Sequence, residues 1–189
     1  LGTQMRAVGE VMSIGKTYKE ALQKAIRSLE IGRYGLGWAK DFHERTLDEL
    51  LDMLREPTSE RQFILYEALR KGADIDALYA RTAIKPWFLQ QMMELVDEEE
   101  QLLAYRGALP PDDMLAQAKR DGFADRYLAL LLGIPEQRIR ERRIHLGVVE
   151  GWDMVPVSGA EDAVYYYSTY NAPNRVTTDQ RRKVMILGG

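Results

Sequence analysis

The chain has 189 residues, 46% of them hydrophobic and 29% charged, with a formal net charge of −3, values of an ordinary soluble globular protein that give no general reason to expect binding to nucleic acid or acidic membranes. Because it has no cysteine, disulfides and cysteine-based metal sites or nucleophiles are excluded, and with only His43 and His145 a metal site would have to rest on carboxylates. No apolar run approaches the roughly 20 residues that cross a bilayer, and the N-terminus lacks the zones of a signal peptide, so we expect a cytoplasmic protein.

Capping-box pairs predict short helices in the first half of the chain. Three helices begin at such pairs: Thr17 with Glu20, Thr46 with Glu49, and Ser59 with Gln62. Gly32, Pro57 and Gly72 follow as their end signals. A short fourth helix is predicted over 74–81.

Prolines mark the helix starts in the second half. Pro86 lies where a first helical turn tolerates proline, and mostly apolar positions continue at helical spacing from Phe88 to Leu103, with Glu99 among them. Three further helices are predicted: one after Pro110–Pro111 that ends at Gly122, one over 127–132 capped by Asp125, and a basic one over 136–145 after Pro135.

The pattern changes to β-type segments after residue 147. Short strands are predicted over 152–157 and 164–170, followed by a polar linker and an apolar strand over 183–187. The predicted fold class is therefore mainly α: a compact bundle of seven or eight short helices, with short β segments at both ends.

Two acidic features are candidates for binding sites. Asp97–Glu100 presents four consecutive carboxylates, but on a helix these point in different directions, so we interpret them as a solvated face. Glu10 has no second carboxylate or histidine near it in sequence, so a structural hydrogen bond is favoured over a metal or nucleotide ligand. We therefore assign no metal-binding residue.

Aromatic and methionine side chains near Pro86 allow two interpretations. Trp87, Phe88, Met92 and Met93 could form a partner-binding patch, because such side chains are favoured in contact cores. Burial in the chain's own core is favoured, since Phe88 and Met92 share one helical stripe.

A helix-turn-helix resemblance covers Gly122 to Arg143. Two short helices flank a Leu-Gly-Ile-Pro turn, and the second carries Arg138, Arg140, Arg142 and Arg143, which could contact phosphates or guanine edges. Because the same spacing builds any packed pair of helices and the arginines are scattered around the helix, a nucleic-acid partner is the less favoured alternative.

Several segments, in this order, are similar to landmarks of one family. They are Thr3–Gly15, Glu20–Glu30, Pro86–Leu89, Ala118–Asp125 and Tyr165–Tyr170. Together they resemble the large subunit of carbamoyl-phosphate synthetase: Thr3–Gly15 resembles the closing strand and turn of an ATP-grasp domain, and Val184–Gly189 the opening strand of a second nucleotide-binding half.

The resemblance implies a non-catalytic piece of a larger ligase. Residues 1–16 would end the carboxyphosphate domain, 17–151 would be the helical oligomerisation domain, and 152–189 would be a linker and the first strand of the carbamoyl phosphate domain. The parent would use two ATP, Mg²⁺ and K⁺ to make carbamoyl phosphate for arginine and pyrimidine synthesis, with a small glutaminase subunit and other large subunits as partners. Its ligands would lie outside Leu1 to Gly189, so we expect no catalytic, cofactor-binding or metal residue here.

Two features limit how far this resemblance can be extended along the chain. The run Val155–Asp162 departs from the family's usual sequence, and Pro156 is unable to donate to a strand ladder. The pair Gly188–Gly189 is typical of a phosphate-binding turn but also of any strand end. An independent ATP-binding enzyme is a third alternative, disfavoured because the glycine-rich and ligand-bearing segments are missing.

Overall fold

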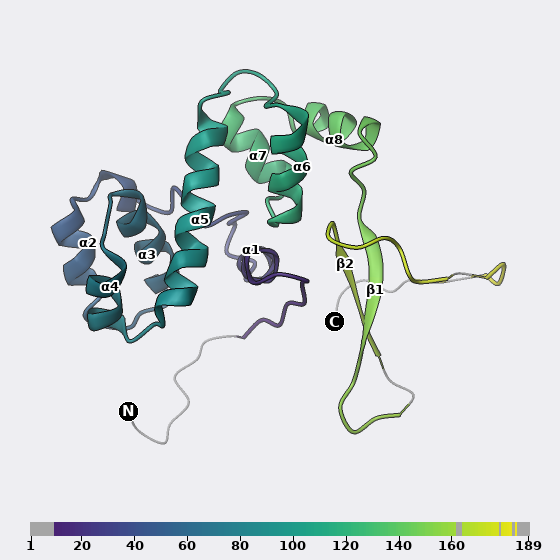
Figure 1. Ribbon diagram of the computed structural model, residues 1–189, viewed down its shortest axis with the longest axis horizontal. Helices are drawn as coiled ribbons and strands as arrows, with labels where there is room; N and C mark the ends of the chain where they lie inside the picture. The colour runs from purple at the N-terminus through teal and green to yellow at the C-terminus, as the bar shows by residue number, and fades with distance from the viewer. Residues whose placement is uncertain (1–9, 162–163, 178, 183, 185–189) are drawn as a thin grey trace.

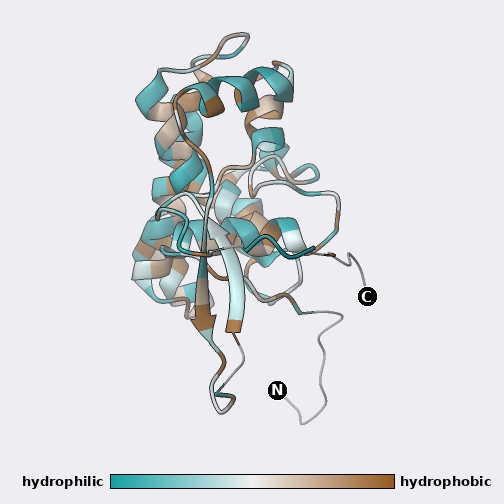
Figure 2. Cartoon of the chain, turned by 90° about the vertical axis from the view of Figure 1, so that its right-hand side faces the viewer, coloured by the Kyte–Doolittle hydropathy of each residue, from teal (hydrophilic) through white to brown (hydrophobic). Residues whose placement is uncertain are grey.

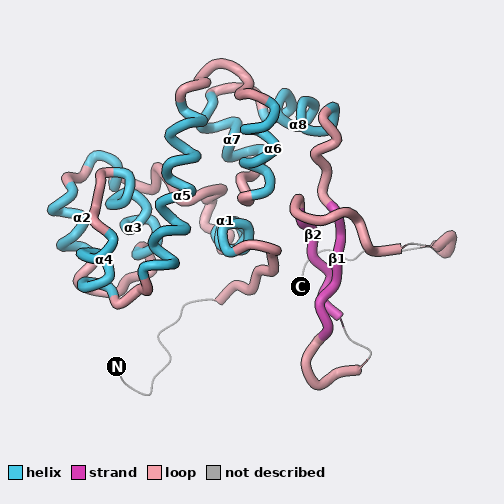
Figure 3. The backbone as a smooth tube through the Cα atoms, in the orientation of Figure 1, coloured by secondary structure: helices cyan, strands magenta, loops and turns pink. Residues whose placement is uncertain are grey.

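The computed structural model describes residues 10–161, 164–177, 179–182 and 184. In these residues the chain is mainly α-helical, as expected, and ends in a two-stranded antiparallel sheet (Figures 1 and 3). The elements are α1 (Tyr18–Ser28), η1 (Phe42–Glu44), α2 (Leu47–Met53), α3 (Arg61–Arg70), α4 (Ile75–Thr82), α5 (Pro86–Leu103), α6 (Asp112–Arg120), α7 (Asp125–Leu132), α8 (Glu136–His145), β1 (Gly151–Pro156) and β2 (Val164–Thr169).

Side-chain caps mark the starts of α1, α2 and α4. Thr46 and Glu49 form a complete capping box at α2, and Asp74 caps α4 by accepting from the Ala77 amide. At α1, Thr17 accepts from the Glu20 amide, but Glu20 accepts from the amide of Lys16 rather than that of Thr17. The capping box predicted from Thr46 and Glu49 is therefore confirmed, whereas at α1 only the Thr17 cap forms and the helix ends earlier than expected.

Two predicted caps are wrong. The Ser59 and Gln62 pair does not open α3, which begins at Arg61 after Glu60 without a side-chain cap. Asp125 is the first residue of α7 rather than its cap. Its carboxylate bonds to cationic side chains of α6 and α8 instead, because these contacts satisfy it more fully than an amide would.

Helix α5 is the central helix of the helical part, and α1, α3, α4 and α7 all contact it. In Figure 1, α2, α3 and α4 lie on one side of it, α1 lies on the other side, and α6, α7 and α8 lie near its C-terminal end. Its apolar stripe packs against α1, α3, α4 and α7 through fully buried leucines such as Leu89 and Leu95. Figure 2 shows polar and apolar colours alternating along the helices, as expected for amphipathic elements around one core.

The hairpin confirms the predicted strands over 152–157 and 164–170 within a residue at each end. β1 pairs with β2 in a register that places Asp153 opposite Tyr167 and Met154 opposite Tyr166. Pro156, at the end of β1, is paired with Val164. The expected strand at 183–187 lies outside the described residues except for Val184, as does most of the expected N-terminal strand, and the described residues 10–15 form no strand.

Candidate functional site

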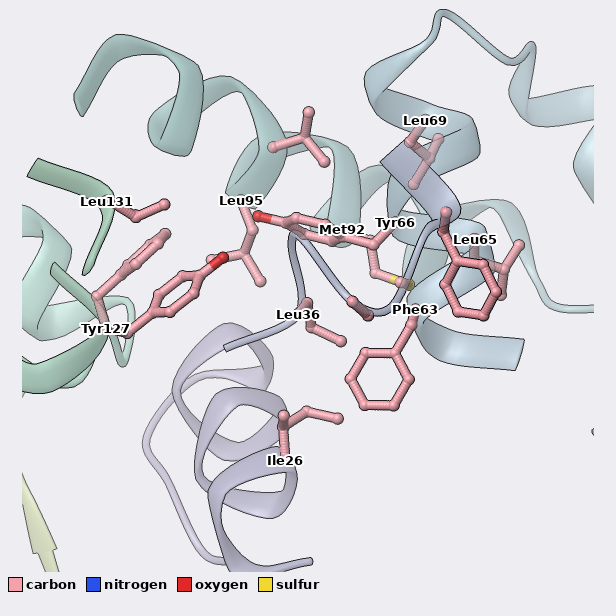
Figure 4. Close-up of a cluster of buried hydrophobic side chains, with 14 of the residues drawn as sticks. Ile26, Leu36, Phe63, Leu65, Tyr66, Leu69, Met92, Leu95, Tyr127 and Leu131 are labelled. Atoms are coloured by element: carbon pink, nitrogen blue, oxygen red, sulfur yellow. The ribbon is translucent and has the colours of Figure 1, made fainter. Parts of the chain in front are cut away.

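A buried carboxylate joins the two sides of the helical part. Glu99 of α5 is 0% exposed, and its Oε2 accepts hydrogen bonds from the hydroxyls of Tyr66 at 2.9 Å and Tyr127 at 2.8 Å. Figure 4 shows the two tyrosine rings approaching from opposite sides, with their hydroxyl oxygens turned toward each other. Burial raises the pKa of Glu99, while Arg70 and the two tyrosines oppose that shift.

Arg70 supplies the compensating charge. Its Nη2 donates to Glu99 Oε1 at 2.6 Å, and its Nε donates to Glu67 Oε2 at 3.1 Å. Burial lowers the pKa of Arg70, but the carboxylates of Glu99 and Glu67 outweigh burial, so the pKa is raised. Because a buried charge without partners is costly, this network favours one arrangement of α3, α5 and α7.

The same network fixes the long loop between α1 and α2. The Trp38 amide donates to Glu67 Oε1 at 2.8 Å, and the Gly37 amide donates to the Tyr127 hydroxyl at 3.1 Å. A Cβ at Gly37 would lie 2.4 Å from Glu99 Oε1, and a Cβ at Gly35 would lie 2.4 Å from the Tyr127 ring. The loop therefore requires glycine at these positions to approach the network.

A second polar junction holds the hairpin segment against α1 and α6. Asn171, just after β2, donates to the carbonyl of Arg120 at 2.8 Å and to Glu20 Oε2 at 3.1 Å. Gln23, buried on α1, donates to the carbonyl of Asp121 at 3.2 Å. These bonds connect three segments that are far apart in sequence.

Ion pairs extend this junction to α7 and α8. Buried Lys119 lies 2.6 Å from Asp125 Oδ1, and Arg143 lies 2.7 Å from Asp125 Oδ2. Burial raises the pKa of Asp125, but the two cations more than offset this, so the net shift is downward. Tyr170 lies beneath both cations, with its ring centroid 4.9 Å from Lys119 Nζ.

The two faces of the hairpin differ. Asp153 and Tyr167 are buried on one face, where Lys16 Nζ lies 2.7 Å from Asp153 Oδ2 and over the Tyr167 ring. Trp152 and Met154, on the other face, are 45% and 48% exposed. The hairpin thus docks on the helices through one face and presents apolar side chains on the other.

The interpretation of Asp97–Glu100 as a solvated face is wrong for two of its members. Glu99 is the centre of the buried network, and Glu98 is partly buried, which together with the charge of Asp121 raises its pKa to about 8. Asp97 and Glu100 are exposed. The helical spacing already placed Glu99 on the apolar stripe, and a carboxylate at such a position is a signal of a buried, partnered charge.

The aromatic pair after Pro86 is more exposed than expected. Trp87 is 56% exposed and Phe88 is 37% exposed, and both pack on the Tyr18 ring with centroids 5.4 and 5.1 Å apart. Only Met92 of the four candidates is fully buried. Phe88 lies beside the buried stripe rather than in it, because Leu89 occupies the inward position.

The remaining candidates form no ligand site in the part of the chain that the structure describes. Glu10 is exposed. No group of three or more His, Asp or Glu side chains is placed to hold a metal ion in the described ranges, so these residues do not fit a Mg²⁺ site. The pair Gly188–Gly189 lies outside the described residues. No described helix has the length and apolar character needed to cross a bilayer.

The helices of the helix-turn-helix resemblance exist as α7 and α8, but the arginines serve other contacts. Arg143 is buried against Asp125, and Arg142 is paired with Asp112 at 2.5 Å. Arg138 and Arg140 are exposed. The arginines therefore do not form one phosphate-binding face.

Comparison with known proteins identifies the family. Residues 10–147 match the family described as carbamoyl-phosphate synthetase large chain, oligomerisation domain. The carbamoyl phosphate synthase large chain of Archaeoglobus fulgidus is 44% identical over all of this chain, which corresponds to 18% of that protein. The arginine-specific large chain of Arabidopsis thaliana, named as chloroplastic, is 38% identical over all of this chain and 16% of its own length.

The chain thus spans less than one fifth of the length of these relatives. Both the match to the oligomerisation domain and the identity along the whole chain are consistent with the helical fold and with the segments noted in the sequence. This chain belongs to the carbamoyl-phosphate synthetase large chain family and contains its oligomerisation domain.

Proposed function

We propose that this chain is the scaffold segment of a carbamoyl-phosphate synthetase large chain. In the whole protein it would hold two ATP-grasp halves at a fixed spacing and contribute to the assembly of large chains, and it would carry no catalytic residue itself. The proposed divisions are residues 1–16 for the end of the first half, 17–151 for the helical domain and 152–189 for the linker to the second half.

The whole protein would be a cytoplasmic ATP-dependent ligase. It would make carbamoyl phosphate from bicarbonate, ammonia or glutamine, and two ATP with Mg²⁺ and K⁺, and it would receive ammonia from a small glutaminase subunit. The similar proteins support this proposal for the whole protein, because they are carbamoyl phosphate synthase large chains. No step of that reaction is assigned to the residues described here.

One observation carries the scaffold role: the hairpin is fixed to the helices by buried polar contacts. Asn171 bridges Glu20 and Arg120, and Lys119, Asp125 and Arg143 join α6, α7 and α8 beside Tyr170. Contacts of this kind specify one orientation, because misplacing either side would leave buried charges unpaired. A segment that transmits a fixed spacing needs this property.

The assembly role requires a surface, and the aromatic cluster of Tyr18, Trp87 and Phe88 supports one. The three rings lie within 5.4 Å of one another, and Trp87 is 56% exposed. Aromatic side chains are enriched at protein interfaces and often dominate their energetics. We infer that this cluster contributes to self-association.

Sedimentation velocity over a hundredfold range of concentration tests this role. A reversible dimer is expected, and Trp87→Ala should raise its dissociation constant about tenfold, which corresponds to about 1.4 kcal/mol. Trp152→Ala, which removes an exposed tryptophan from the hairpin, is the matched control and should leave the constant unchanged. A monomer at every concentration would contradict self-association through this chain, and equal effects of the two variants would contradict the choice of surface.

A further inference from the structure

A pocket lies between the loop after α1 and the adjoining ends of α5 and α7. It has a volume of about 300 Å³ and is called the loop pocket here. Its walls are aromatic and aliphatic, with Tyr34 and Trp38 from the loop and Tyr127, Leu130 and Leu131 from α7. This size and composition are at the small end of what ligand-binding pockets show.

The charged side chains that line the loop pocket are all cationic. Arg33 and Arg106 both line it, and no carboxylate does. Arg33 donates to backbone carbonyls of Gly37 and Trp38 and to no carboxylate, while its buried Nε has no hydrogen-bond partner in the described structure. Next to the pocket, Arg126 lies over the Tyr34 ring at 4.3 Å and adds a further positive charge.

Backbone strain in the loop places the indole of Trp38 at the pocket. Trp38 has a φ of 58° and Lys40 has a φ of 46°, a region that non-glycine residues seldom adopt. The Glu67 side chain holds this conformation by accepting from the Trp38 amide. Such strain is concentrated at ligand-binding and active sites.

We propose that the loop pocket binds a small amphipathic anion, an aromatic or aliphatic group that carries a carboxylate or a phosphate. The apolar group would lie among Tyr34, Trp38 and Leu131, and the anionic group would face Arg33 and Arg106. A bound anion would supply the negative charge that the lining lacks, opposite the guanidinium groups of Arg33 and Arg106. The site is separate from the aromatic cluster and the hairpin junction, so it goes beyond the scaffold function.

Two probes separate the sources of the anionic group, phenyl phosphate and phenylacetate. Titration of the isotope-labelled chain, followed by amide chemical shifts, should show saturable changes confined to residues 32–38, 103–106 and 127–131 with at least one of the two. Benzyl alcohol and inorganic phosphate should each bind at least tenfold more weakly. Benzyl alcohol lacks the anionic group, and inorganic phosphate lacks the apolar group.

Arg106→Gln is the decisive variant, because Arg106 is exposed and its loss should not unfold the chain. It should weaken binding of the preferred probe at least fivefold. Arg138→Gln, at an exposed arginine of α8 outside the pocket, is the control and should bind as the wild type does. The proposal is overturned if neither probe produces saturable shifts at the pocket, or if Arg106→Gln binds as tightly as the wild type.

Discussion

Tyr66 on α3 and Tyr127 on α7 donate their hydroxyl hydrogens to the same oxygen, Oε2 of Glu99 on α5, at 2.9 and 2.8 Å. All three side chains are buried, and Arg70 occupies the other oxygen of the carboxylate. One charge is therefore shared by three helices that are far apart in sequence, and the long loop joins the network where the Gly37 amide donates to the Tyr127 hydroxyl. Removing any donor leaves the carboxylate less well solvated by the protein.

We predict that Tyr127→Phe and Tyr66→Phe each lower the free energy of unfolding by about 1–3 kcal/mol, because each leaves a buried charged acceptor with one donor fewer. The double variant should depart from additivity by more than about 0.5 kcal/mol, since both hydroxyls serve one oxygen. Urea unfolding of the wild type, the two single variants and the double variant gives the four free energies of this double-mutant cycle. Strict additivity would contradict a shared network.

Gly37→Ala should destabilise the chain by at least about 2 kcal/mol, because the new methyl group would overlap Glu99, Arg70 and Tyr127. Gly72→Ala is a useful comparison, because nothing lies within 4 Å of its added Cβ and its cost comes from a φ of +82° alone. That cost should be about 1 kcal/mol. Thermal unfolding monitored by tryptophan fluorescence measures the loss of stability in each variant. Equal losses would indicate that the loop shifts to accommodate the methyl group without disturbing the network around Glu99.

Stability should fall as the pH rises from about 5 to about 8, and Glu98 should be a main cause. Its burial and the neighbouring Asp121 raise its pKa from the ordinary value of 4.5 to about 8, with Lys19 and Arg120 opposing the shift. Between these values the folded chain keeps a proton that the unfolded chain has released, so raising the pH favours unfolding.

Glu98→Gln should remove about 1–2 kcal/mol of this pH dependence, a discounted figure because the side chain is only partly buried. The exposed Asp97→Asn, on the same turn of α5, serves as the control. Unfolding free energies measured at pH 5, 6.5 and 8 test the point. A Glu98→Gln profile parallel to that of the wild type would show that Glu98 is ionised in the folded chain at neutral pH.

Asn171→Ala should loosen the hairpin from the helices. The variant loses the bonds to the Arg120 carbonyl and to Glu20, so amide hydrogen exchange in β1 and β2 should accelerate about tenfold while α3 is unchanged. Asn174→Ala is the matched control, because Asn174 bonds to Trp152 and Val176 rather than to the helices. If both variants accelerated hydrogen exchange in β1 and β2 equally, the cause would lie within the hairpin segment and not in its bonds to the helices.

Elements with local causes were predictable from the sequence. The cap at Thr46 and the proline start at Pro86 depend on neighbours within a few residues, and both are confirmed. The roles of Glu99 and Asp125 depend on side chains that arrive from other helices, such as Tyr127 and Arg143. Local sequence patterns do not reveal contacts between residues that are far apart in the chain. For this reason the solvated face at Glu99 and the cap at Asp125 were predicted wrongly.

The exposure of Trp87 has the same origin. Whether an aromatic residue in a first turn is covered depends on what packs beside that turn, and here the rings of Tyr18 on α1 and the adjacent Phe88 contact Trp87 but leave it 56% exposed. The loop pocket could not be predicted from the sequence either, because it forms only where the strained loop at Trp38 contacts α5 and α7.

The scaffold role requires that the hairpin keep one fixed position on the helices, and a distance between the two parts reports that position. The chain has no cysteine, so spin labels at Gln90→Cys on α5 and Met154→Cys on the exposed hairpin face report one defined pair. Pulsed electron spin resonance should give a single narrow distance distribution that broadens in Asn171→Ala. A broad or two-peaked distribution in the otherwise wild-type chain would contradict a fixed scaffold.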